Sequence, residues 1–144
     1  MNTFCRPAQV QRGFTLIELL VTMIVVTILA LLAESSYSQY VVRGSRAAAE
    51  TELVQLASVQ EKIYLNSSAY ATDLTAAYTG QAGGGVGRTS GKTNDGKYTI
   101  TLATDAAGQS YTLTATPIST STQKNDGAIT IDSTGTRMWN GKPW

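Results

Sequence analysis

The chain has 144 residues, a formal net charge of +1, one cysteine and no histidine. This length allows one domain with an added membrane segment and excludes a large multidomain enzyme. The missing histidine removes the usual zinc sites and imidazole bases, and a single cysteine excludes an intramolecular disulfide. We therefore expect no enzyme activity, no cofactor and no metal site, and the near-neutral charge gives no support to general nucleic-acid binding.

A short basic leader precedes a long apolar segment. The leader, MNTFCRPAQVQRG, carries Arg6 and Arg12 and no acidic residue. Residues 14–33 follow, with sixteen apolar residues among twenty and a single charge, Glu18. A helix of this length, at about 1.5 Å per residue, spans the roughly 30 Å hydrocarbon core of a bilayer. Because the positive-inside tendency keeps the leader in the cytoplasm, we expect a leader over 1–13, a transmembrane helix over 14–35 and an exported domain over 36–144.

Two other interpretations of the apolar segment remain open. A cleaved secretory signal has an apolar region of about 7–15 residues and is cut after that region. Here the discontinuity lies before it, between Gly13 and Phe14. A buried helix of a soluble protein is the other interpretation, and the uninterrupted length disfavours it.

An amphipathic pattern continues the helix beyond the apolar segment. Four apolar residues recur at helical spacing while nearby charged residues lie off their stripe: Ala49, Leu53, Leu56 and Ile63 against Glu50, Glu52, Glu61 and Lys62. We predict one helix over about 14–65, with the charged side solvated and the end near residues 66–68. Gly44 is its weakest position.

The second half of the chain changes to a period of two. Residues 70–78 are expected to form a connecting segment, and residues 80–96, with seven glycines among seventeen residues, a flexible loop. Alternating apolar residues then predict three strands, around 98–102, 111–115 and 129–131, with a hairpin connection at 105–109 and a possible fourth strand over 136–139. The predicted fold class is α+β, with the second half of the helix packed on a small antiparallel sheet of three to four strands.

Motifs for catalysis or ligand binding are weak in this half. GVGRTSGKT lacks the phosphate-loop spacing because Val86 stands five residues before Gly91, and a strand follows it. Asp126 and Asp132 lack the spacing of an EF-hand calcium loop. Six cations form a candidate DNA-binding stripe, of which the first four are the candidate contacts, although a solvated surface is the plainer interpretation: Arg88, Lys92, Lys97, Lys124, Arg137 and Lys142. Trp139 and Trp144 are the candidates for base stacking.

The junction G|FTLIE, the apolar helix and the sheet that follows together resemble a type IV prepilin. Four later stretches, YATDL, DGKYTITL, SYTLTATP and ITIDSTG, are similar to pilins of the PilE type, so the resemblance covers most of the chain. It implies that a prepilin peptidase cuts between Gly13 and Phe14 and methylates the new amino group of Phe14. It also implies a structural subunit that polymerises through its N-terminal helix.

The resemblance also implies which partners the chain has and where in the cell it lies. The partners are other copies of the chain, other pilins and the inner-membrane assembly machinery. The precursor is a single-pass inner-membrane protein, and the assembled subunit lies in a surface pilus that supports adhesion, twitching motility or DNA uptake. A type II secretion pseudopilin and a DNA-binding minor pilin for natural transformation are the alternatives.

Glu18 has a physical rationale in such a subunit. A carboxylate near the end of a membrane helix lies close to the interface, where its cost is below the roughly 2.5–3.5 kcal/mol of a charge at the bilayer centre. In a bundle of like helices the carboxylate needs a partner, and the amino terminus of a neighbouring subunit has the opposite sign. A misplaced subunit leaves both charges unpaired, so we expect Glu18 to set the axial register. A carboxylate merely tolerated at a helix end is the alternative.

Two departures from the resemblance concern the helix and the C-terminal region. Ser35 stands where such pilins often have a proline, before Ser36 and Tyr37. The chain also lacks the cysteines of the usual C-terminal disulfide. We therefore expect the C-terminal loop to be held by packing, with Trp139 or Trp144 as the candidates.

Overall fold

The computed structural model of the chain describes residues 13–144, and the side chains of all of these except 32–36. The expected leader, apart from Gly13, lies outside the described residues. The chain divides into two compact units, one ending at Ser38 and the other comprising Gln39–Trp144.

One helix, α1, spans Leu16–Ser67, close to the predicted bounds of 14–65. At its start, the Thr15 hydroxyl accepts a hydrogen bond from the Glu18 backbone N–H at 3.3 Å, as an N-cap side chain does. At its end, Ser68 has a positive φ of 56° and donates its backbone N–H to the Tyr64 carbonyl at 2.7 Å. This left-handed residue closes the last turn.

In the first unit, the apolar side chains of α1 are uncovered. Leu16 and Met23 are 84% and 66% exposed, and Phe14, just before the helix, is 84% exposed. The Thr22 and Thr27 hydroxyls donate to carbonyls of the preceding turn, so these polar groups are satisfied within the helix. Among the residues that the structure describes, no helix is both long enough and apolar enough to cross a membrane. The membrane-spanning role expected for residues 14–35 stays a prediction.

The second unit contains a five-stranded antiparallel sheet. Its strands are β2 (Tyr98–Thr104), β3 (Tyr111–Pro117), β4 (Ile129–Asp132), β5 (Arg137–Trp139) and β6 (Lys142–Pro143), paired in that order. The α+β class is confirmed, but the expected number of three to four strands is wrong. The additional strand, β6, follows a two-residue turn in which Asn140 and Gly141 have positive φ of 48° and 75°. Asn-Gly is the sequence signal for this hairpin turn.

Residues 70–78, expected to connect helix and sheet, include a further strand, β1 (Asp73–Tyr78), outside the five-stranded sheet. The glycine-rich segment pairs with it: the Val86 and Gly87 backbone N–H groups donate to Asp73 and Ala76, each at 3.0 Å. A Cβ at Gly85 would overlap the Ala76 carbonyl, so the close approach of the two segments requires glycine. Much of the loop that we expected to be flexible is therefore fixed by backbone hydrogen bonds.

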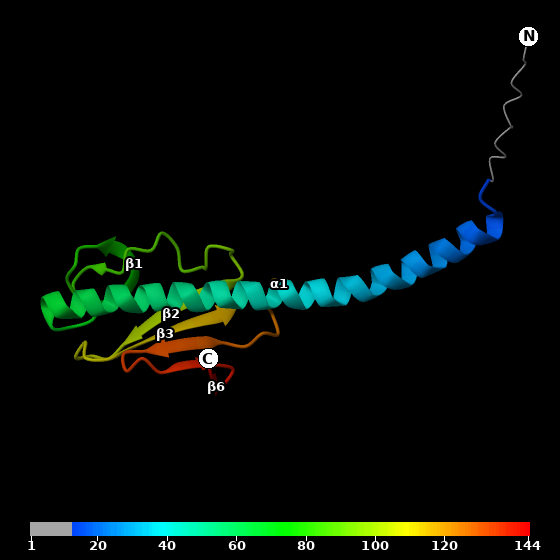
Figure 1. Ribbon diagram of the computed structural model, residues 1–144. Coiled ribbons are helices and arrows are strands. Elements are labelled where there is room, and N and C mark those ends of the chain that lie inside the picture. The colour runs from blue at the N-terminus through cyan, green and yellow to red at the C-terminus, as the bar shows by residue number, and fades with distance from the viewer. Residues whose placement is uncertain (1–12) are drawn as a thin grey trace, which may run out of the picture. The chain divides into compact units, whose positions relative to one another are not determined.

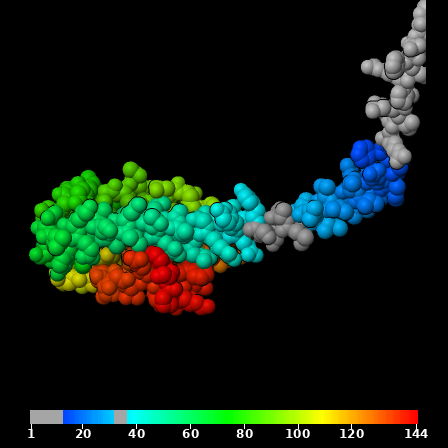
Figure 2. All heavy atoms as spheres, in the orientation of Figure 1, coloured from blue at the N-terminus to red at the C-terminus, as the bar shows by residue number. Residues whose placement is uncertain are grey.

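The core of the second unit lies between α1 and the sheet. Figure 1 shows this part of α1 with β2–β6 along one side and β1 with its loop along the other. The predicted stripe is confirmed, since Ala49, Leu53, Leu56 and Ile63 are all buried. They pack in one cluster with inward-facing strand residues, including Ile100, Leu113, Ala115, Ile129 and Ile131. Figure 2 shows that the side of this part of α1 turned toward the viewer is not covered by any other element.

Glu52 corrects the expectation that the charged side of the helix is solvated. Its side chain is buried, and its carboxylate accepts hydrogen bonds from the Arg88 guanidinium and the Asn94 backbone N–H, each at 2.9 Å. Burial of a carboxylate is tolerated here because both partners compensate the lost hydration.

Candidate functional site

Phe14 and Glu18, expected to act in processing and assembly, lie at the start of the uncovered apolar segment. Phe14 stands two residues before α1, and Glu18 lies in its first turn. Both side chains are exposed. The first turn of a helix has unpaired N–H groups and the positive end of the helix dipole, so it favours a carboxylate. The roles of Gly13, Phe14 and Glu18 stay predictions.

The four candidate DNA contacts differ in whether their charged groups already have a hydrogen-bond acceptor within the domain. Arg88 is held by the domain itself: its guanidinium pairs with Glu52 and donates to the Lys92 carbonyl at 2.6 Å. The Lys97 ammonium donates to the Ser45 hydroxyl at 2.7 Å and is part-buried. Lys92 and Lys124 are exposed, and within residues 13–144 their ammonium groups have no hydrogen-bond acceptor. The last two are therefore the cations of this group that are free to meet a phosphate.

A polar cluster fixes the loop between β3 and β4 to α1. Arg46 contacts both carboxylate oxygens of Asp126, and the Tyr98 hydroxyl donates to the same carboxylate. The Trp139 indole N–H donates to the Asp126 carbonyl at 2.7 Å, and the Arg46 guanidinium lies 3.6 Å from the centroid of the Trp139 ring. Burial raises the pKa of Asp126, but the hydrogen bonds from Arg46 and Tyr98 outweigh it and hold the pKa below its ordinary value.

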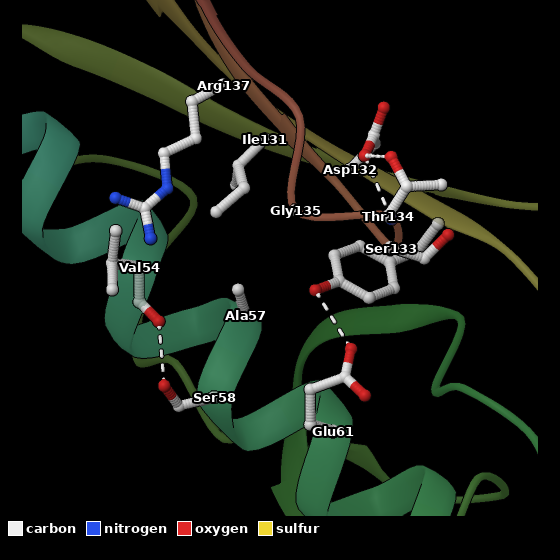
Figure 3. Close-up of a pocket in the computed structure, with 11 residues that line it drawn as sticks. Val54, Ala57, Ser58, Glu61, Ile131, Asp132, Ser133, Thr134, Gly135 and Arg137 are labelled. Atoms are coloured by element: carbon white, nitrogen blue, oxygen red, sulfur yellow. Dashed lines mark hydrogen bonds between the residues drawn. The ribbon is translucent and has the colours of Figure 1, made fainter. Parts of the chain in front are cut away.

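A cavity of about 300 Å³ opens between α1 and the turn that joins β4 to β5. Val54, Ala57, Ile131 and Tyr111 supply apolar surface, and Figure 3 shows Arg137 and Glu61 on different sides of it. Asp132, also at the cavity, accepts hydrogen bonds from the backbone and hydroxyl of Thr134 and from the Thr136 backbone. The sequence placed Glu61 on the solvated side of the helix and gave no sign of the cavity, because the lining residues come from distant parts of the chain.

Comparison with known proteins places these features in a family. The family model described as type IV minor pilin ComP, DNA uptake sequence receptor, matches residues 35–130, more than half of the chain. The model of the prokaryotic N-terminal methylation motif matches residues 9–33. The chain belongs to the type IV pilins.

Two individual relatives support the assignment to the type IV pilins. Fimbrial protein EcpC of Eikenella corrodens is 34% identical to this pilin over 128 residues, which cover 89% of this chain and 76% of that protein. A type IV pilin structure from Shewanella oneidensis superposes with a TM-score of 0.52 and 19% identity, covering 72% of this chain and 97% of that one. At that identity, the likeness is one of fold alone.

The resemblance found in the sequence is therefore confirmed. This pilin is a structural subunit that assembles with other pilins into type IV pilus filaments, which related pilins form at the cell surface. Pilin families are structural rather than enzymatic, which agrees with the expected class of protein.

Proposed function

We propose that this pilin is made as an inner-membrane precursor and cut by a prepilin peptidase between Gly13 and Phe14. The methylated Phe14 then forms the mature N-terminus, and the assembly machinery moves residues 14–35 from lipid into the filament core. The observation that carries this proposal is the uncovered apolar segment with Glu18 in its first helical turn. The methylation-motif match over residues 9–33 spans the proposed cleavage site and supports it.

Glu18 sets the axial register of a subunit in this proposal. Its carboxylate pairs with the amino terminus of the neighbouring Phe14, and a subunit out of register leaves both charges buried and unpaired. Glu18→Gln keeps the size of the side chain and removes the charge. The variant should be processed normally and yield fewer sheared filaments. Thr27→Val is the matched control, because it removes a polar but uncharged group, the Thr27 hydroxyl, from the same segment. Filament yield equal to wild type in Glu18→Gln would contradict the register role.

The cleavage step has its own test. Gly13→Leu places a bulky residue before the cut and should leave uncleaved precursor in the membrane fraction, with no filaments. Cleavage of this variant at the wild-type rate would contradict the proposed site. Wild-type precursor that fractionates away from membranes would contradict the membrane step.

A second function is favoured by the family match over residues 35–130. We propose that this pilin binds DNA, with Lys92 and Lys124 contacting phosphates. The description of the matched family as a DNA uptake sequence receptor supports it, as do the exposed ammonium groups of these two lysines. Lys97 contributes only if its ammonium leaves the Ser45 hydroxyl, to which it donates at 2.7 Å. The Arg88 side chain has a structural role instead, because it already pairs with Glu52.

Salt dependence tests the DNA contacts. Each phosphate contact to duplex DNA adds about 0.9 to the slope of log affinity against log salt concentration. Lys92→Ala with Lys124→Ala should therefore lower the slope by about 2 in filament-bound or detergent-solubilised pilin. Arg88→Ala should lower stability and leave the slope unchanged. Absence of DNA binding at low salt, or an unchanged slope in the double variant, would contradict the assignment.

A further inference from the structure

The cavity between α1 and the β4–β5 turn holds two opposite charges that do not pair with each other. Glu61 and Arg137 both line it, yet neither takes part in an ion pair among the described residues. Figure 3 shows them reaching the cavity from α1 and from β5, with Ala57 and Ile131 between them. The space between an unpaired carboxylate and an unpaired guanidinium is suited to a ligand with both a hydrogen-bond donor and an anionic group.

The Glu61 carboxylate is held in one orientation. The Tyr70 hydroxyl donates to its two oxygens at 3.1 and 3.3 Å, and the Tyr111 hydroxyl donates to Oε1 at 3.4 Å. Burial of the ring, with the nearby Glu61, raises the pKa of Tyr70 to about 12 and raises the pKa of Tyr111 as well. Both phenols therefore keep their protons at neutral pH, and Glu61 retains lone pairs for a further donor.

Arg137 is positioned at the other side of the cavity. Its guanidinium lies 5.3 Å from the centroid of the Trp144 ring, within the range of a cation–π contact. Its side chain is exposed, so its donors can reach a phosphate. Between the two charges, Val54, Ala57 and Ile131 offer an apolar floor, and Tyr111 adds an aromatic wall. Aromatic and apolar surface of this kind accepts an unstacked base.

We propose that this cavity binds one nucleotide of single-stranded DNA and selects bases that carry an exocyclic amino group. Arg137 pairs with the phosphate, the base lies on the apolar floor, and Glu61 accepts a hydrogen bond from the amino group, as Glu does from cytosine N4. This inference rests on the DNA binding proposed above. Near a polyanion, Glu61 is unfavourable unless the base offers a donor, so it contributes selectivity rather than affinity.

The proposed site should distinguish DNA ligands by base and by strandedness. Thymine carries the acceptor O4 where cytosine carries its amino group, so a thymine base held in the same orientation turns a carbonyl oxygen toward the Glu61 carboxylate. A base enters the cavity only after it leaves its stack, which is easier in a single strand than in a duplex. We therefore expect cytosine strands to bind more tightly than thymine strands or duplex of equal length.

The test measures binding of the processed full-length pilin in detergent to oligonucleotides of about 12 nucleotides, a length within the site sizes of single-strand binding proteins. Wild type should bind oligo-dC at least about fivefold more tightly than oligo-dT, the low end of discrimination by a base contact. Glu61→Gln should abolish or reverse this preference, because the Gln amide can donate to the thymine O4. Arg137→Ala should weaken both complexes and lower the salt slope by about 0.7. Lys142→Ala, an exposed cation that does not line the cavity, is the control and should keep the preference.

An oligonucleotide with the same phosphates and no bases provides a measurement that does not depend on a variant folding. Wild type should bind it no more tightly than oligo-dT. Equal binding of the dC, dT and abasic strands, with the lysine-dependent salt slope intact, would overturn the cavity proposal and leave DNA binding standing. No binding of any strand by wild type would overturn both.

Discussion

The Arg46 guanidinium of α1 pairs with the carboxylate of Asp126, a residue 80 positions further along the chain. Its Nε lies 2.9 Å from one carboxylate oxygen, and its Nη2 contacts the other oxygen. The contact ties the loop before β4 to the helix, and Gln123 in the same loop donates to the Val42 carbonyl at 2.8 Å. The C-terminal loop is thus held on α1 without a disulfide. Trp139, expected to pack there, takes part by covering Arg46 and bonding the Asp126 carbonyl.

Asp126→Asn should destabilise the second unit. The change leaves Arg46 largely buried without its counter-charge, and loss of one partner of a buried pair costs about 3 kcal/mol or more. Urea unfolding of wild type and variant, followed by tryptophan fluorescence, measures the difference. Asp105→Asn is the control, because Asn also serves the hairpin turn and the site is exposed. Equal losses in both variants would contradict a special role for Asp126.

The same pair makes stability depend on pH. The folded pKa of Asp126 lies below its unfolded value of about 3.9, so protons bind the unfolded state more readily. Its contribution is complete above that value and is lost as the pH falls through the folded pKa. Asp73, Asp95, Asp105 and Asp132 shift in the same direction. The free energy of unfolding should fall below about pH 4, and less steeply in Asp126→Asn. Parallel pH profiles for the two proteins would contradict this linkage.

Much of the fold was predictable because burial leaves a periodic trace in sequence. The stripe of Ala49, Leu53, Leu56 and Ile63 and the alternation in β2, β3 and β4 both record which side faces the core. Strand β1 left a much weaker trace, since one of its faces is exposed throughout and the other is at most half-buried. Strand β6 has only two residues, too few for a periodic pattern, and its local signal is the Asn140–Gly141 turn that precedes it.

The candidate sites were less predictable because they depend on contacts between distant segments. Arg88 resembles a free cation in sequence, and only the fold brings it to Glu52. Glu61 resembles a solvated helix residue, and only the fold brings two tyrosine hydroxyls to it. The N-terminal motif differs from these sites, since it is contiguous and could be identified directly from its residues.

Glu52→Gln should loosen the segment after the glycine-rich turn. The change removes the charge that pairs with Arg88 and weakens the acceptor of the Asn94 N–H. Both side chains are largely buried, so we expect a loss of about 1.5–3 kcal/mol, as for a hydrogen bond to a charged group. Hydrogen exchange at the Asn94 amide should become faster. Glu50→Gln, two positions earlier in α1, is the control, and unchanged exchange in Glu52→Gln would contradict the assignment.

Gly85→Ala should disrupt the pairing of β1 with the glycine-rich segment. The new methyl group overlaps the Ala76 carbonyl, and a backbone atom cannot move aside as a flexible side chain does. Gly83→Ala is a matched control, because a Cβ there meets nothing within 4 Å. Amide exchange at Val86 and Gly87 should accelerate in the first variant alone. Similar exchange in both variants would show that the close approach is not required.

The central claim is that this pilin is cut at Gly13 and enters filaments through residues 14–35. Mass spectrometry of the N-terminal peptide, taken separately from sheared surface filaments and from membranes, tests it most directly. We predict a peptide that begins at Phe14, carries one added methyl group and is abundant in the sheared fraction. An intact Met1 terminus found only in membranes would contradict the claim.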